Sequence, residues 1–162
     1  MIRRAAESDF QSILSLIDSG RRIMRESGNP GQWPEGKPEP EKIRKDIENG
    51  NSWIVEENGV PAATFAFIEG PDPTYARIDG GAWLNEEPYY VIHRIARSQS
   101  ARGVFRTVMD WCFGRTGNIR IDTHKDNAIM RHCLESYGFR YCGIIYLENG
   151  DERLAYQLFR EK

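Results

Sequence analysis

An arginine-rich loop near the middle of the chain joins two regular segments. Tyr89–Ala96 is an apolar run typical of a strand, and Val104–Phe113 has the apolar spacing of a helix. Three arginines and a glycine lie in and beside the loop: Arg97, Arg102, Gly103 and Arg106. The first N–H groups of a helix have no acceptor within it, and the helix dipole makes that end positive. Guanidinium groups bind phosphate oxygens in pairs. We therefore predict a site for an anion with several phosphate oxygens; the alternative is a solvated basic patch.

Length and composition limit the class of protein. The 162 residues, 40% hydrophobic and 28% charged, suit one globular domain, which we predict over residues 1–162. A net charge of −2 argues against a dedicated nucleic-acid binder. No apolar run approaches the roughly 20 residues of a membrane helix, and the first residues lack the apolar core of a signal peptide. We expect a cytoplasmic protein with no membrane or nucleic-acid partner. The three cysteines and His132-Cys133 lack ligand spacing, so we expect no metal.

The remaining elements alternate between strands and helices. Strands are predicted at Ile2–Ala5 and Asn118–Thr123, and in hairpins over Ser52–Glu69 and Arg140–Phe159. Helices are predicted from Ser8 or Asp9 to Arg25, over Glu41–Glu48 and over Asn127–Tyr137. Ser27–Pro40 is rich in proline and glycine and is predicted to be a loop, whereas Arg77–Trp83 fits a weak strand or a loop. This order predicts an α/β fold, in which one mixed sheet carries helices on both faces.

Three segments carry a resemblance to a known family. They are VIHRIA followed by ARGVF, DNAIMRHCLESYGF, and RYCGIIYL followed by RLAYQ. With these segments the chain resembles the GNAT acyltransferase superfamily over residues 89–159. The resemblance implies the GNAT-like acyl-CoA N-acyltransferase fold, with a central, mostly antiparallel mixed sheet. It also implies two splayed parallel strands, which would be Tyr89–Arg97 and Asn118–Thr123.

The same resemblance implies acetyl-CoA as the acyl donor, bound between the splayed strands. The pantetheine arm would pair with the main chain of the first strand, at Ile95, Ala96 and Arg97. The pyrophosphate would lie on the following loop and helix start, against Arg102, Gly103, Val104, Phe105 and Arg106. Asn127 matches the helix-start asparagine of the family, which contacts the pantetheine arm.

The chain departs from the family pattern at two positions. Phe105 stands where a small residue usually lets the backbone approach phosphate; a ring turned into the core would leave the amide free. Leu134 stands where a tyrosine often protonates the departing thiolate. Tyr137, one helical turn further on, is the candidate replacement acid. The acid is also dispensable in principle, because a thiolate with a reference pKa near 8.5 is a tolerable leaving group.

Acyl transfer to an amine also needs an oxyanion site and a base. The backbone N–H of Ile95 is the candidate oxyanion donor. His93 is the candidate base because of its reference pKa of roughly 6.5, and the alternative is a structural histidine. Strand alternation predicts that His93, Ile95 and Arg97 share one face. No Cys-His pairing is evident, so we expect direct attack in a ternary complex.

The acceptor pocket would be built from the variable loops. By resemblance, Gln32 and Trp33 of the proline-rich loop line it, although Trp33 also fits simple cover of the core. We therefore predict an acetyl-CoA-dependent N-acetyltransferase that acts on a primary amine of a small molecule or peptide. The alternative is a GNAT-fold module that binds CoA without efficient turnover. Dimerisation is common in the superfamily, so a homodimer is a further expectation.

Overall fold

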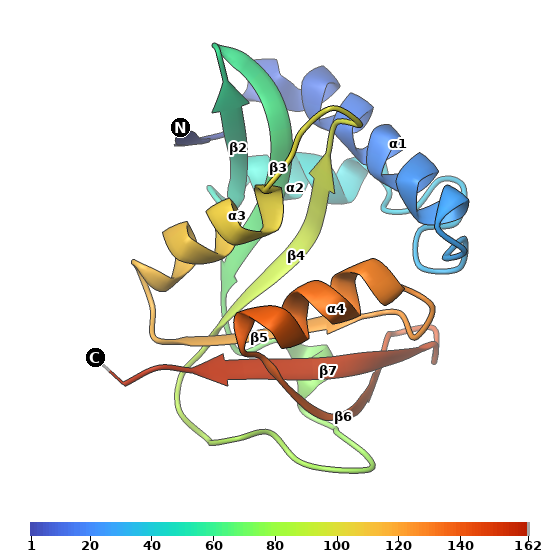
Figure 1. The fold of residues 1–162 in the computed structure, drawn as a ribbon, viewed down its shortest axis with the longest axis vertical. Helices are drawn as coiled ribbons and strands as arrows, with labels where there is room; N and C mark the ends of the chain where they lie inside the picture. Colours follow the sequence, from blue (N-terminus) through green and yellow to red (C-terminus); the bar gives the residue numbers. More distant parts are fainter. Residues whose placement is uncertain (162) are drawn as a thin grey trace.

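The computed structural model describes residues 1–161, which form one seven-stranded sheet in the order β1-β2-β3-β4-β5-β7-β6 (Figure 1). The strands are β1 (Ile2–Arg4), β2 (Ser52–Glu57), β3 (Val60–Glu69), β4 (Tyr90–Arg97), β5 (Asn118–Thr123), β6 (Arg140–Tyr146) and β7 (Glu152–Phe159). All neighbouring pairs are antiparallel except β4 and β5, which run parallel. The predicted mixed, mostly antiparallel sheet is confirmed.

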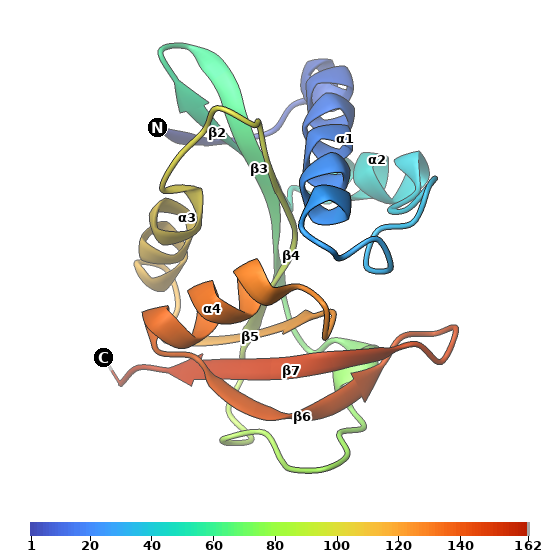
Figure 2. The ribbon, with the colours of Figure 1, turned by 45° about the vertical axis from the view of Figure 1, so that its right-hand side comes forward.

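Helices cover both faces of this sheet, as predicted (Figure 2). They are α1 (Phe10–Glu26), α2 (Pro40–Glu48), α3 (Val104–Phe113) and α4 (Ala128–Tyr137), with short 3₁₀ turns η1 (Glu7–Asp9) and η2 (Pro73–Tyr75). The apolar sides of α3 and α4 bury Val108, Met109 and Leu134 in the largest core cluster. Those of α1 and α2 bury Ile13, Ile17 and Ile43 in a second cluster. The amphipathic spacing of each helix thus fixes which face of the sheet it covers.

β4 and β5 part after a short stretch of pairing. The residue pairs between them are Tyr90 with Ile119 and Val91 with Arg120, at the start of each strand. Beyond these pairs the strands diverge towards their carboxyl ends, which leaves the backbone edge of each strand without a neighbouring strand in the gap. The implied pair of splayed parallel strands is therefore present.

A bulge in β4 breaks the alternation that the sequence pattern predicts. Arg94 has a φ of 55°, and the register with β3 shifts at this point, so that Arg94 and Ile95 lie opposite Phe65 alone. Ile95 packs against the cluster under α3 and α4, whereas His93 bonds to Asp72 on the opposite side of the sheet. The prediction that His93 and Ile95 share one face is therefore wrong, because the left-handed residue between them adds an extra step.

The segment from Arg77 to Trp83 forms no strand and makes one isolated bridge, between Asp79 and Ile144 of β6. Gly81 lies so close to this strand that an added Cβ would be 2.1 Å from the carbonyl oxygen of Cys142. This close approach explains the glycine. It lets the segment lie flat against β6.

Candidate active site

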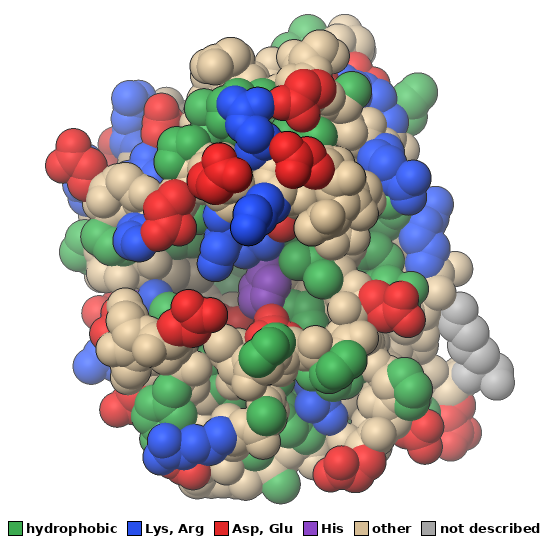
Figure 3. Space-filling model, turned by 180° about the vertical axis from the view of Figure 1, so that it is seen from behind, with side chains coloured by type: hydrophobic (Ala, Val, Ile, Leu, Met, Phe, Trp, Pro, Cys, Tyr) green, Lys and Arg blue, Asp and Glu red, His purple; other side chains and the backbone are tan. Residues whose placement is uncertain are grey.

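A cavity of about 640 Å³ lies where β4 and β5 part. Ile92, Ile95, Ile121 and Met130 give it an apolar lining on the side of α3 and α4. Charged residues line the opposite side, and a space-filling view of that side shows a hollow with a histidine at its floor (Figure 3). The cavity therefore has an apolar side and a charged side, and the gap in the sheet lies between them.

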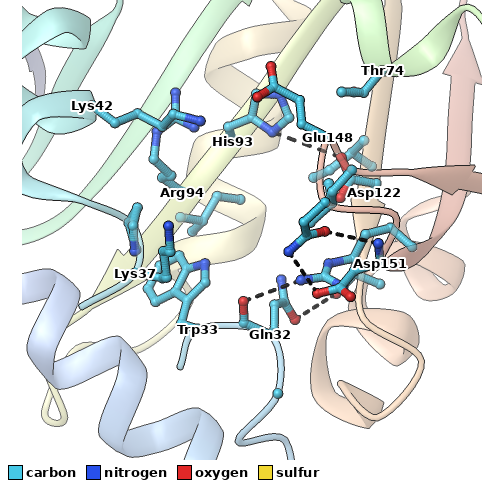
Figure 4. A pocket seen from close by; sticks show the side chains of 18 of the residues that line it. Gln32, Trp33, Lys37, Lys42, Thr74, His93, Arg94, Asp122, Glu148 and Asp151 are labelled. Atoms are coloured by element: carbon cyan, nitrogen blue, oxygen red, sulfur yellow. Dashed lines mark hydrogen bonds and ion pairs between the residues drawn. The ribbon is translucent and has the colours of Figure 1, made fainter. Parts of the chain in front are cut away.

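Three basic side chains of the lining face three acidic ones across this cavity (Figure 4). Lys37, Lys42 and Arg94 approach from the proline-rich loop, α2 and β4. Asp122, Glu148 and Asp151 face them from β5 and from the turn between β6 and β7. This arrangement suits a polar ligand with groups of opposite charge.

His93 lies between two carboxylates in the floor of the cavity. Its Nε2 is 3.0 Å from Asp72 Oδ2, and its Nδ1 is 4.0 Å from Asp122 Oδ2. Asp122 also accepts a hydrogen bond of 2.6 Å from the buried hydroxyl of Tyr75. The hydrogen bond to Asp72 thus fixes the orientation of the imidazole ring, and Asp122 lies beside its other nitrogen.

The surroundings set the ionisation of two members of this cluster. Burial acts to raise the pKa of Asp72, but hydrogen bonds from His93 and Thr74 outweigh it and hold that pKa at about 2. Burial, with the nearby charge of Asp122, raises the pKa of Tyr75 well above its ordinary value of 10.0. At neutral pH Asp72 is therefore an anion and Tyr75 a neutral hydrogen-bond donor.

The arginine-rich loop presents free backbone donors at the start of α3. Among residues 1–161, nothing accepts a hydrogen bond from the backbone N–H groups of residues 103–106. Gly103 precedes the helix with a φ of 69°, and an added Cβ there would meet no atom within 4 Å. Backbone conformation, rather than space, is therefore what favours glycine at this position. The ring of Phe105 packs against the core and Tyr137, so the amide of Phe105 stays accessible.

The three arginines near this loop do not all act alike. Arg97 and Arg102 donate to carbonyl groups of the loop itself, including that of Ala101. Arg106 lies 5.4 Å from the ring of Tyr137. Arg97 and Arg102 thus brace the loop, and all three bring positive charge to the helix start.

Gln32 and Asn127 are joined by a direct hydrogen bond. Oε1 of Gln32 accepts from Nδ2 of Asn127 at 2.9 Å, and also from Asn29 and from the backbone of His124. Oδ1 of Asn127 caps α4 by accepting from Met130 N–H. Gln32 and the neighbouring Trp33 both line the cavity. Gln32 therefore ties the proline-rich loop to the start of α4.

Trp33 combines the two roles that the sequence leaves open. It lines the cavity and also packs against the second core cluster, under α1 and α2. An added Cβ on Gly20 would lie 3.0 Å from its ring. Trp33 thus covers part of the core and forms part of the cavity wall.

The structure does not bring Tyr137 to the cavity. Its hydroxyl donates to Asp110 of α3 at 2.6 Å, and its ring packs beside Phe113 and Phe139. Leu134 is fully buried in the main core. No tyrosine among residues 1–161 lines the cavity in the place where a proton donor for the leaving thiolate would stand.

Sequence reasoning missed several residues of this site. Asp72, Tyr75 and Asp122 were not among the predicted site residues, and neither was Arg153. Each follows or precedes an ordinary turn, without a spacing that marks it. Only the folding of η2 under β4 brings Asp72 to His93.

The chain matches a known protein family over most of its length. The model of the Acetyltransferase (GNAT) family matches residues 19–139, which is most of the chain. This chain belongs to the GNAT family. Among solved structures, an acetyltransferase of the GNAT family from Streptococcus agalactiae 2603 is 34% identical, with a TM-score of 0.90. That match covers 100% of this chain and 96% of the other.

More distant solved structures share the fold. A GNAT-family acetyltransferase from Listeria monocytogenes 4b F2365 is 23% identical, with a TM-score of 0.74 and coverage of 99% and 94% of the two chains. AAC(6')-Ib, solved in complex with parmomycin and acetyl-CoA, is 17% identical, with a TM-score of 0.66 and coverage of 99% and 93%. No match was found among curated proteins. Within residues 1–161, no helix of this GNAT protein is long and apolar enough to cross a membrane, and no three acidic, histidine or cysteine side chains cluster as metal ligands.

Proposed function

We propose that this GNAT protein is an acetyl-CoA-dependent N-acetyltransferase that acts on a primary amine of a small molecule or peptide. One observation carries the proposal: the cavity between the splayed strands joins an apolar wall at Ile95 to a charged wall at His93. An acyl donor and a polar acceptor would meet there from opposite faces of the sheet. The complex of AAC(6')-Ib with acetyl-CoA supports the choice of donor by analogy of fold.

The residues at the start of α3 fit the phosphates of the donor. The backbone N–H groups of residues 103–106 are free at the positive end of the helix dipole, and the ring of Phe105 packs into the core away from them. Arg102 and Arg106 add charge. The open edge of β4 at Ile95, Ala96 and Arg97 suits a pantetheine arm that bonds as an added strand. Asn127, at the start of α4, would be within reach of the same arm.

The chain's own residues then assist a direct transfer. The amine nitrogen forms a bond to the thioester carbonyl carbon, and the carbon–sulfur bond breaks. The Ile95 N–H would stabilise the oxygen that becomes negative, which is the role of an oxyanion donor. His93, held by Asp72, accepts the proton that the amine loses. The thiolate leaves without a tyrosine acid, because Leu134 cannot supply a proton.

The decisive test is turnover of acetyl-CoA with a panel of primary amines, followed as release of CoA. We expect at least one amine to be acetylated, with acetyl-CoA and CoA both raising the melting temperature and ATP leaving it unchanged. Stabilisation by both CoA species without turnover of any amine would favour the alternative, a CoA-binding module of GNAT fold. This alternative is considered because Leu134 stands where a tyrosine would protonate the leaving thiolate.

A further inference from the structure

Arg153 is a buried cation that makes no direct ion pair among residues 1–161, although the charges of Asp122 and Asp151 lie nearby. It is the second residue of β7, 6% exposed, and it lines the cavity. A guanidinium group has five N–H donors. Within residues 1–161, the acceptors of this one are the carbonyl oxygens of Glu152, at 2.9 Å, and Gln32, at 3.4 Å. In that same part of the chain it forms no ion pair and lies over no aromatic ring.

Two other shielded arginines show how the chain usually compensates such a charge. Arg94 makes a two-fold ion pair with Asp46, with Nε and Nη2 as donors. Arg120, also 6% exposed, lies over Trp83 and Tyr89, at 4.3 and 4.0 Å from the ring centres. Arg153 makes neither kind of contact. Burial lowers its pKa, the charges of Asp122 and Asp151 act the other way without outweighing burial, and the group stays charged. A buried charge that keeps free donors in a cavity is suited to an anionic ligand group.

The strand register places Arg153 on the same side of the sheet as the acidic cluster. Asp122 of β5 pairs with Ala155 of β7, and Arg153 lies two residues before Ala155. Because side chains alternate along a strand, Asp122, Ala155 and Arg153 share one face. It is the face on which Asp122 bonds to Tyr75. Along the strands, the two charged residues are separated by about 7 Å.

We propose that the acetyl acceptor carries a carboxylate as well as the reacting amine, and that Arg153 binds this carboxylate. The assignment rests on the proposed function. His93, Asp72 and Asp122 receive the amine at one end, and the guanidinium holds the carboxylate at the other by paired hydrogen bonds. A spacing of a few bonds between the two groups identifies amino acids and closely related amines as the substrate class. Arg153 is then a specificity-determining residue.

Paired substrates test this proposal directly. Each standard amino acid with a primary amine is compared with its α-carboxamide in acetyl-CoA turnover. The enzymes compared are the wild type, Arg153→Gln, Arg153→Lys and a control, Arg140→Gln. Arg140 is exposed at the start of β6 and does not line the cavity. The carboxamide has the less basic amine, so its intrinsic reactivity works against the expected preference.

We expect the wild type to prefer the amino acid of at least one pair by about 10- to 100-fold in kcat/KM. Arg153→Gln should lose that preference, chiefly through a raised KM for the amino acid, whereas turnover of the carboxamide should fall far less. Arg153→Lys should retain part of the preference and Arg140→Gln all of it. An unchanged rise of melting temperature with acetyl-CoA shows that a variant still folds. If a variant does not fold, the comparison of amino acid with carboxamide in the wild type still tests the proposal.

Three results would overturn the proposal. Equal turnover of amino acids and carboxamides by the wild type would refute the acceptor carboxylate while leaving the acetyltransferase intact. Turnover of no amine would refute the proposed function and this assignment together. A defect of Arg153→Gln confined to transfer of a succinyl group from succinyl-CoA to a simple alkylamine would show that the carboxylate belongs to the acyl group instead.

Discussion

Arg94 and Asp46 are joined by two hydrogen bonds, of 2.7 and 2.9 Å, between the bulge of β4 and the helix α2. Both side chains are shielded, at 15% and 11% exposure. Arg94 has the left-handed φ that a residue with a side chain rarely adopts. The ion pair holds this conformation and therefore fixes the step at which Ile95 turns to one face of the sheet and His93 to the other.

Loss of the ion pair between Arg94 and Asp46 should lower the stability of the folded protein. We expect Asp46→Ala to lower the free energy of unfolding by about 3 kcal/mol, because it leaves a shielded guanidinium without its partner. The control is Glu7→Ala, which removes an exposed ion pair with Arg44, a residue of the same helix α2 as Asp46. It should lower the free energy of unfolding by less than about 1 kcal/mol. Urea unfolding measures both. Equal losses in the two variants would show that the bulge does not depend on the pair.

Replacement of His93 should affect catalysis more than binding. If the imidazole accepts the proton of the amine, His93→Gln should lower kcat by about 100-fold or more. The melting-temperature rise with acetyl-CoA should be unchanged. His132→Gln is the matched control, because His132 is exposed on α4 and bonds to Ser136. A fall of kcat similar to that of the control would leave His93 with a structural role.

Stability should depend on pH through Asp72. Its pKa is about 2 in the folded chain against an ordinary value of 3.8, so the folded state favours the ionised carboxylate. The stabilisation is complete above the unfolded pKa and is lost as pH falls from about 4 towards 2. It amounts to about 2 kcal/mol, and Asp72→Asn should show no such loss over the same window. Urea titrations at closely spaced pH values compare the two. Parallel pH curves for wild type and variant would contradict the assignment.

Donor binding should depend on the start of α3. Gly103→Glu brings a negative charge to the free amides and forces a side chain onto a φ of 69°. We expect it to abolish the stabilisation by acetyl-CoA, which is about 2.7 kcal/mol at 100 times the Kd. Gly103→Ala carries the same backbone strain without the charge and should keep most of the effect. If both variants lose it equally, strain rather than repulsion of phosphate is responsible.

The sequence predicts the regular elements of this fold well. Alternating and helical apolar patterns give β5 and α3 at their observed bounds, since local periodicity alone decides them. The path of residues 77–83 is not set by a local pattern. It depends on the contact of Gly81 with Cys142, and these two residues are far apart in the sequence. No local pattern contains that information.

The proposed donor side of the site is more local in the sequence than the proposed acceptor side. The predicted phosphate loop is a short polar segment with Gly103 between a strand pattern and a helix pattern, so it can be expected from adjacent residues. The cluster of Asp72, His93 and Asp122 draws on three separate segments, and the bulge at Arg94 reverses the facing that strand alternation predicts. Tyr137 shows the limit of helical spacing as well, since its hydroxyl is bonded to Asp110 instead of reaching the cavity.

The parting of β4 and β5 should make the sheet flexible at the link between its two halves. The described sheet consists of a β1–β4 half and a β5–β7 half, linked edge to edge at Tyr90–Ile119 and Val91–Arg120. A donor arm seated in the gap would add backbone bonds where the strands themselves have none, so the loaded protein should resist bending about this link more than the free one. Hydrogen–deuterium exchange would report the difference as protection at residues 94–97, with little change at Val91. The acyl donor would thus be a reactant that also makes the two halves of the sheet more rigid while it is bound.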